Sequence, residues 1–235
     1  MKETAQNHNK TGNLDDDLSL LAECDLVIAA VIEDLEIKQD LYRRVDTARK
    51  PGSIVTSNTS TIPLAKLVSG LPEGFARDFA ITHFFNPPRY LRLLEVVAGT
   101  HTRADAITSL QVFGDRTLGK SVVQCKDTPG FIANRIGILW TTSAIRFAFE
   151  DQLSVEEADA IVGRPMGIPK TGVFGLMDLV GIDLQPHVSA SMLSSLPEQE
   201  MFRDLHQESE LITRMIREGY TGRKGKGGFY RLNRT

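Results

Sequence analysis

Cysteine is scarce in this chain of 235 residues, which contains only Cys24 and Cys125. Two cysteines cannot form a disulfide framework, and neither lies at metal-ligand spacing from other Cys, His or Asp residues. We therefore expect reduced thiols in the core, and we predict no metal site.

Long apolar runs and an excess of basic charge are also missing. No stretch approaches the roughly eighteen apolar residues of a membrane span, and the first ten residues include no apolar signal segment. The formal net charge is −3, without a basic stripe, which argues against a nucleic-acid partner. These absences predict a cytoplasmic globular protein with no membrane contact.

Two motifs of enzyme chemistry are absent as well. No Gly-x-Ser-x-Gly turn occurs, which argues against a serine hydrolase of the α/β type. The glycines at 222, 225, 227 and 228 neither follow a predicted strand nor open a predicted helix, so they do not form a dinucleotide-binding turn. Lys224 in this loop either reaches toward an anion or belongs to a run of solvated charges.

The first half of the chain alternates strand and helix patterns. Strands are predicted at 25–31, 53–57, 79–83, 93–97 and 121–124, with helices at 33–49, 63–68 and 103–118. Thr102 and Asp105 resemble a capping box for the last of these helices, and Gly119 ends it. Short links between alternating elements favour right-handed crossovers and a mainly parallel sheet.

After residue 126 the pattern becomes helical throughout. Helices are predicted at 131–150, 155–162, 172–180, 183–195 and 208–218, the second opened by a Ser154–Glu157 capping box. The prediction is an α/β protein with a polar tail at 1–24, a mainly parallel sheet domain at 25–126 and an all-helical domain at 127–235.

His83 is the leading catalytic candidate. An apolar lead-in places it at the end of a strand, before Asn86 and two prolines, and ligands of open α/β sheets bind at that carboxyl edge. Glu95 lies in an otherwise apolar strand, where a buried carboxylate requires a partner. An imidazole oriented by a carboxylate is a good general base near neutral pH. The alternative is a core histidine beside an unrelated glutamate.

Other polar residues are expected near the same edge. The turn Ser57-Asn58-Thr59-Ser60-Thr61 follows a strand, and its hydroxyls either bind a substrate oxygen or cap the next helix. Asn134 begins the helical domain, where it either faces a ligand cleft or is an ordinary polar surface residue.

Six motifs in order resemble the L-3-hydroxyacyl-CoA dehydrogenase family. They are Asp25-Leu-Val-Ile-x-Ala-Val, Ser57-Asn-Thr-Ser60, His83-Phe-Phe-Asn-Pro87, Leu94-Glu-Val96, Lys126-Asp-Thr-Pro-Gly-Phe131-Ile-x-Asn134-Arg135 and Gly228-Phe-Tyr230. The resemblance covers about residues 25 to 230. Arg164-Pro-Met-Gly167 and Asp178-Leu-Val-Gly-Ile-Asp183 also resemble the helical domain of that family.

The resemblance implies a partial Rossmann-type NAD-binding domain at 25–126 and a helical substrate and dimerisation domain at 127–235. It also implies NAD-linked interconversion of 3-hydroxyacyl-CoA and 3-oxoacyl-CoA by a homodimer. By position, the implied roles are a base for His83, orientation of that base for Glu95, and substrate binding for Ser60 and Asn134. The implied cofactor contacts are Glu33, Lys38, Ser60, Asn86 and Lys224.

Two departures from the family pattern stand out. The family's sheet normally starts with a strand, a Gly-x-Gly-x-x-Gly turn and a helix that bind pyrophosphate, and this chain has no such start. Ala29 also replaces a glutamate usual in the family. We therefore expect a fragment, impaired on its own, whose apolar strand edge at 26–31 is covered by the N-terminal tail, by another chain or by nothing.

Two other functions remain open from the sequence. One is a catalytically silent module that binds acyl-CoA or dimerises. The other is a different two-domain, NAD-linked dehydrogenase that acts on a small hydroxy acid.

Overall fold

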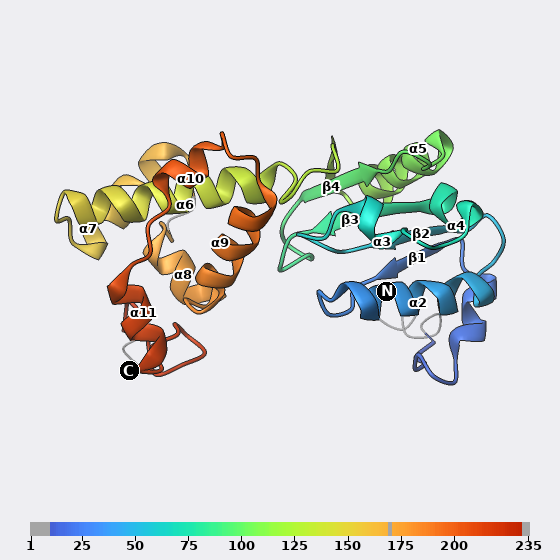
Figure 1. The fold of residues 1–235 in the computed structure, drawn as a ribbon, viewed down its shortest axis with the longest axis horizontal. Coiled ribbons are helices and arrows are strands. Elements are labelled where there is room, and N and C mark those ends of the chain that lie inside the picture. The colour runs from blue at the N-terminus through green and yellow to red at the C-terminus, as the bar shows by residue number, and fades with distance from the viewer. Residues whose placement is uncertain (1–9, 169–170, 232–235) are drawn as a thin grey trace. The chain divides into compact units, whose positions relative to one another are not determined.

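The computed structural model describes residues 10–168 and 171–231. Residues 1–9 of the predicted tail and the last four residues of the predicted helical domain lie outside the described residues. The chain divides into two units, Met1–Phe131 and Ile132–Thr235. The first is an α/β sheet unit and the second a helical unit, as the sequence predicted (Figure 1).

One five-stranded sheet forms the centre of the first unit. Its strands are β1 (Leu26–Ala29), β2 (Ile54–Ser57), β3 (Phe79–Phe84), β4 (Leu93–Ala98) and β5 (Ser121–Cys125), in the spatial order β1-β2-β3-β4-β5. The pairs β1–β2, β2–β3 and β4–β5 are parallel. The pair β3–β4 is antiparallel, because only a short excursion separates these strands and no helix crosses between them.

Helices cover both faces of this sheet, which explains its nearly continuous apolar strands. Phe79 and Ile81 pack with Tyr42 of α2 (Leu35–Ala48) on one face. Ala80, between them in β3, packs with Ile107 of α5 (Ala104–Val112) on the other face. Figure 1 shows α2 and α5 on opposite sides of the strands. Strand alternation thus sends successive side chains into two cores.

The remaining elements of the first unit are short. They are the 3₁₀ helix η1 (Leu18–Glu23), α3 (Leu64–Leu67), α4 (Glu73–Asp78) and the π-helical turn η2 (Phe113–Thr117). The predicted capping box at Thr102 and Asp105 is wrong. The N-cap of α5 is Arg103, without a side-chain cap, because the Thr102 hydroxyl instead accepts from Gly99 N and donates to the Phe79 carbonyl.

β1 is an edge of the sheet. No other strand among the described residues pairs with its outer side, and Ile28 is 41% exposed. The segment 10–24 lies beside this edge, and the two line a common cavity of about 930 Å³. Leu21 of this segment packs against the core and its carbonyl accepts from Lys50 N. The N-terminal segment therefore covers part of the edge, which is one of the three alternatives that the sequence left open.

The division between the units falls after Phe131, a few residues beyond the boundary expected at 126. The carboxylate of Asp127 accepts hydrogen bonds from Leu64 N and Ala65 N at the start of α3. Phe131 packs in the core of the sheet unit. These contacts hold residues 127–131 to the first unit.

The second unit consists of helices around a separate core. They are α6 (Ala133–Glu150), α7 (Val155–Ile161), the 3₁₀ helix η3 (Arg164–Met166), α8 (Phe174–Val180), α9 (Leu184–Ser195), α10 (Met201–Leu205) and α11 (Glu210–Arg217). The predicted Ser154–Glu157 capping box is present at the start of α7. None of the described helices is long and apolar enough to span a membrane.

Two buried aspartates bind residues 229 and 230 to the helical unit. Asp159 accepts from the backbone N–H groups of residues 173–175 at the start of α8 and from the Tyr230 hydroxyl. Asp178 accepts from Phe229 N and Tyr230 N. A Cβ at Gly228 would lie 1.9 Å from Asp178 Oδ1, so this close approach requires glycine. The glycine-rich segment is thus a docked structural element.

One carboxylate in the sheet unit joins three elements through ion pairs. These ion pairs predict that the fold is sensitive to acid. Asp78 accepts from Arg49 Nη1 at 2.8 Å and from Arg103 Nε at 2.7 Å. Burial would raise the pKa of the Asp78 carboxyl, but the hydrogen bonds from the two arginines outweigh it and hold that pKa below its ordinary value. The charged form therefore stabilises the fold above pH ~4, and this contribution is lost as the pH falls through the lower, folded pKa.

We expect Asp78→Asn to lower the free energy of unfolding by about 3 kcal/mol at pH 7. Urea unfolding across pH 2–7 measures the difference, which should shrink as the pH falls below ~4, because the carboxyl of the unfolded chain is protonated first and the folded carboxyl only at its lower pKa. Asp115→Asn, at an exposed aspartate, is the matched control and should change little. A difference between Asp78→Asn and wild type that grows as the pH falls would contradict this role.

Candidate active site

The His83–Glu95 pair joins two neighbouring strands. His83 lies in β3 and Glu95 lies directly opposite it in β4, in the antiparallel register. The distance from His83 Nδ1 to Glu95 Oε2 is 2.8 Å. The residues are 6% and 1% exposed, respectively. The strand register therefore places an imidazole and a carboxylate in contact inside the sheet unit.

The contact indicates which tautomer the neutral imidazole ring of His83 adopts. An ionised carboxylate only accepts hydrogen bonds, so we assign the proton of the neutral ring to Nδ1, which donates it to Glu95. Nε2 then carries the lone pair. The ring packs beside Phe85 and Phe131, with centroids 4.5 and 5.6 Å away. Carboxylate and aromatic neighbours together hold one ring orientation, which a general base requires.

The turn after β2 is bonded to the strand that carries His83. Asn58 Oδ1 accepts from Phe84 N at 2.9 Å, and Asn58 N donates to the Ala29 carbonyl. One residue thus connects the carboxyl ends of β1, β2 and β3. Asn58 belongs to the polar turn predicted from the sequence, but nothing in the local pattern indicates this long-range bond.

Glu33 binds the same turn, and Lys38 pairs with Glu33. Glu33 Oε1 accepts from Ser60 N and Thr61 N, each at 3.0 Å. Glu33 Oε2 is 3.1 Å from Lys38 Nζ. Lys38 is 1% exposed and also donates to the Val31 carbonyl. The structure therefore brings Glu33, Lys38 and Ser60, three of the predicted site residues, into one network.

The other predicted residues are placed individually. Asn86 is exposed, just beyond the carboxyl end of β3. Asn134 is half-buried in the first turn of α6, in the helical unit. Lys224 Nζ is 2.8 Å from Asp183 Oδ1, also in the helical unit. His83, Glu95, Ser60 and Asn86 thus share the sheet unit, and Asn134 and Lys224 belong to the other.

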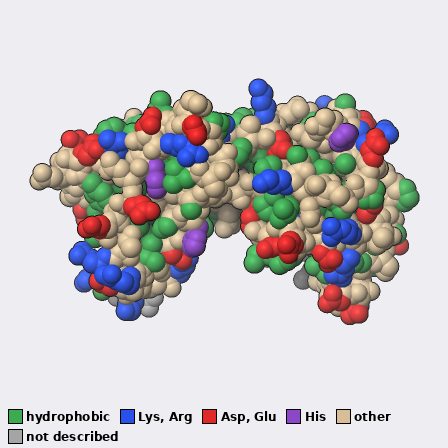
Figure 2. Space-filling view, in the orientation of Figure 1, with side chains coloured by type: hydrophobic (Ala, Val, Ile, Leu, Met, Phe, Trp, Pro, Cys, Tyr) green, Lys and Arg blue, Asp and Glu red, His purple; other side chains and the backbone are tan. Residues whose placement is uncertain are grey.

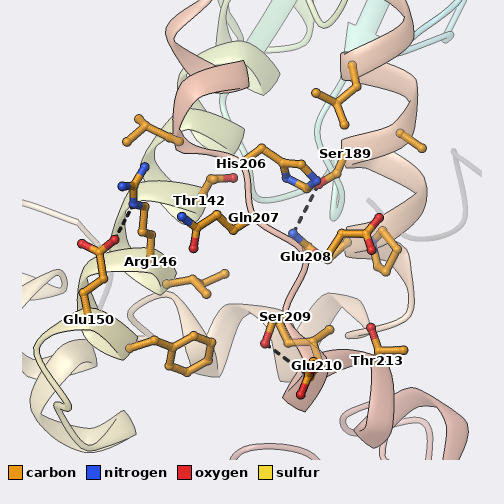
Figure 3. A pocket seen from close by; sticks show the side chains of 18 residues that line it. Thr142, Arg146, Glu150, Ser189, His206, Gln207, Glu208, Ser209, Glu210 and Thr213 are labelled. Carbon is orange, nitrogen blue, oxygen red and sulfur yellow. Dashed lines mark hydrogen bonds and ion pairs between the residues drawn. The ribbon is translucent and has the colours of Figure 1, made fainter.

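A cavity of about 520 Å³ lies within the helical unit, between α6, α9 and the segment around 205–213 (Figure 3). Thr142, His206 and Gln207 project into it, and an Arg146–Glu150 ion pair lies on one wall. None of the predicted site residues lines this cavity. It is therefore separate from the candidate active site.

Comparisons with known proteins decide the family. Residues 1–128 match the profile described as "3-hydroxyacyl-CoA dehydrogenase, NAD binding domain". Residues 130–232 match the one described as "3-hydroxyacyl-CoA dehydrogenase, C-terminal domain". The chain belongs to the 3-hydroxyacyl-CoA dehydrogenase family. The resemblance inferred from six sequence motifs is confirmed, as is the predicted fold class.

Individual members of the 3-hydroxyacyl-CoA dehydrogenase family differ in length from this chain. A putative fatty acid oxidation complex trifunctional enzyme of Rickettsia prowazekii is 42% identical over 94% of this chain, which spans 31% of that protein. A probable 3-hydroxybutyryl-CoA dehydrogenase of Deinococcus radiodurans is 33% identical, over 92% of this chain and 74% of that protein. The crystal structure of M. tuberculosis FadB2 is similar with a TM-score of 0.80 and 32% identity, covering 92% and 73% of the two chains.

Proposed function

We propose that this chain interconverts 3-hydroxyacyl-CoA and 3-oxoacyl-CoA with NAD. The observation that carries the proposal is the buried His83–Glu95 pair, with 2.8 Å between Nδ1 and Oε2, at the carboxyl end of β3. Ligands of open α/β sheets bind at that edge. Membership of the 3-hydroxyacyl-CoA dehydrogenase family supports the substrate class.

His83 transfers the proton in the proposed reaction, and Glu95 assists this transfer. In the oxidation direction, His83 Nε2 takes the proton of the 3-hydroxyl group. The Glu95 carboxylate stabilises the imidazolium that forms and keeps the ring from turning. In the reduction direction, the same Nε2 returns the proton to the oxygen at C3. Ser60 and Asn134 hold the substrate so that this oxygen faces the imidazole.

The sheet edge fits the nicotinamide end of NAD. Asn86 is exposed there, and the Glu33 side chain is 34% exposed beside the turn that carries Ser60. When bound, NAD supplies the acceptor for the hydride that leaves C3. Asn86, Ser60 and Glu33 would hold that end, Lys38 would act through Glu33, and Lys224 is proposed on the cofactor side from the helical unit.

The sequence has no Gly-x-Gly-x-x-Gly turn to bind the pyrophosphate. We therefore propose that this polypeptide alone turns over slowly and saturates poorly with NADH. The test follows NADH absorbance at millimolar NADH with acetoacetyl-CoA as substrate. NADH consumption that depends on acetoacetyl-CoA supports the enzyme. Thioester binding without any NADH consumption would contradict it and favour a silent acyl-CoA-binding module.

Dimerisation through the helical unit is the partner proposal. Leu179, Val180 and Leu184, at the corner between α8 and α9, are 53%, 54% and 46% exposed. Apolar side chains that gather on one surface in this way favour protein contacts. We expect light scattering to give twice the 26.0 kDa chain mass and Leu179→Glu to give the monomer mass. A dimer that persists in Leu179→Glu would contradict an interface at this corner.

A further inference from the structure

The Glu33 carboxylate is the anchor of the turn that carries Ser60. One of its oxygens, Oε1, accepts from the Thr59 hydroxyl, from Ser60 N and from both the amide and the hydroxyl of Thr61. Three consecutive residues of the turn thus converge on a single atom. Hydrogen bonds to an ionised acceptor are among the stronger ones in proteins.

The other carboxylate oxygen of Glu33, Oε2, is held by Lys38. Oε2 pairs with the buried ammonium of Lys38, which also donates to the Val31 carbonyl at 3.1 Å. Lys38 belongs to the first turns of α2, and the Asp34 side chain caps that helix. Both oxygens of Glu33 are therefore bonded to the protein, and a capped helix sets the position of the carboxylate.

The ionisation state of Glu33 agrees with this arrangement. Burial would raise the pKa of its carboxyl, but hydrogen bonds from Thr59 and Thr61 and the charge of Lys38 outweigh it and hold that pKa below the ordinary value. The carboxylate is therefore charged at neutral pH, and its hydrogen bonds have full strength there.

The hydroxyl of Ser60, unlike those of Thr59 and Thr61, does not donate to Glu33. Thr59 and Thr61 direct their hydroxyls to Glu33, and Thr59 Oγ1 also accepts from Ile62 N. No described residue is a hydrogen-bond partner of the Ser60 hydroxyl. The hydrogen bonds of this network thus satisfy the polar groups beside Ser60 and leave its hydroxyl available to a ligand.

We propose that Glu33, held by Lys38, is a positioning residue that fixes the Ser60 hydroxyl for the acyl-CoA substrate. This inference rests on the proposed function, in which Ser60 holds the substrate. It gives Glu33 a role that does not depend on any contact with the cofactor. Its effect on substrate binding must then pass through Ser60.

Two measurements on the full chain test the role. In the first, hydrogen–deuterium exchange compares the wild type with Glu33→Ala. We expect the amides of Ser60 and Thr61 to exchange at least about tenfold faster in the variant, because their shared acceptor is gone. Glu36→Ala, at an exposed glutamate in the first turn of α2, should leave both amides unchanged. Unchanged exchange in Glu33→Ala would overturn the anchoring role.

In the second, calorimetry measures the Kd of acetoacetyl-CoA for Glu33→Ala, Ser60→Ala and the double variant. We expect Glu33→Ala to weaken binding about tenfold in the wild-type background and less than about twofold in the Ser60→Ala background. Glu33→Gln, which keeps an oxygen acceptor, should recover part of the affinity.

The two possible failures give different results. Equal weakening in both backgrounds would overturn the positioning role, since Glu33 would then act by general destabilisation or by touching the ligand itself. No binding of acetoacetyl-CoA by the unaltered protein would instead overturn the proposed function, while the exchange experiment would still report on the anchor.

Discussion

Replacement of His83 by Gln is expected to lower kcat for the reduction of acetoacetyl-CoA about a thousandfold. General acid–base catalysis by a positioned side chain contributes roughly 10²–10⁴ to a rate, and a glutamine amide cannot exchange a proton at neutral pH. Gln retains a hydrogen-bonding group opposite Glu95, so the strand pair β3–β4 should persist. The Kd of acetoacetyl-CoA should therefore stay within about threefold.

His101→Gln is the matched control, because His101 is an exposed histidine of the same unit. We expect its kcat to equal that of the wild type. Stopped-flow absorbance of NADH measures both variants, and urea unfolding shows that each is folded. A His83→Gln protein that keeps more than a tenth of the wild-type kcat would contradict the assignment of His83 as the base.

The second large effect is expected from Glu95→Gln, with a loss of about a hundredfold in kcat. The neutral amide no longer stabilises the imidazolium, and it can present either its oxygen or its NH₂ group to His83 Nδ1. The second orientation selects the ring tautomer whose Nε2 is protonated and cannot act as a base. Folding should change little, because the amide keeps the shape of the carboxyl group and can still hydrogen-bond to the neutral imidazole, whereas Asp78→Asn removes the partner of two charged arginines.

A mutant cycle distinguishes this role from a general structural one. If Glu95 acts through His83, the double variant His83→Gln, Glu95→Gln should be no slower than His83→Gln alone. Single-turnover rates at saturating acetoacetyl-CoA measure all four proteins. Losses that simply multiply in the double variant would show that the two residues act independently, and Glu95 would then not be the residue that orients His83.

The arrangement of the sheet followed closely from local sequence patterns. The strand at 25–31 was predicted because strands covered on both faces are almost continuously apolar, and the strand at 79–83 was predicted from its apolar, β-favouring start; they are present as β1 and β3. The direction of β4 relative to β3 was harder to predict from the sequence. The link between β3 and β4 is too short for a helix, yet the sequence does not state which way the chain returns.

Errors and omissions in helix prediction had local physical causes. Thr102 has the residue type of an N-cap, but its hydroxyl bonds to the Phe79 carbonyl from another element, and no pattern within the helix reveals this competitor. The short helices α4 and α10 have too few turns to show an apolar periodicity.

Within the candidate site, one contact was predictable from the sequence. Glu95 in an apolar strand needed a partner, and His83 on the adjacent strand was the nearest candidate. The anchor function of Glu33 was not predictable in the same way, because it depends on four donors of three residues in a turn 26 to 28 residues away. On the face drawn in Figure 2, acidic and basic side chains occur on both units.

Transfer of deuterium tests the central claim most directly. The full chain is incubated with acetoacetyl-CoA and NADH deuterated at C4 on either face, and the CoA product is analysed by mass spectrometry. We predict 3-hydroxybutyryl-CoA that carries one deuterium at C3 from one of the two labelled cofactors, and none with His83→Gln in the same time. Formation of no labelled product at millimolar cofactor, or equal labelling by His83→Gln, would contradict a dehydrogenase whose base is His83.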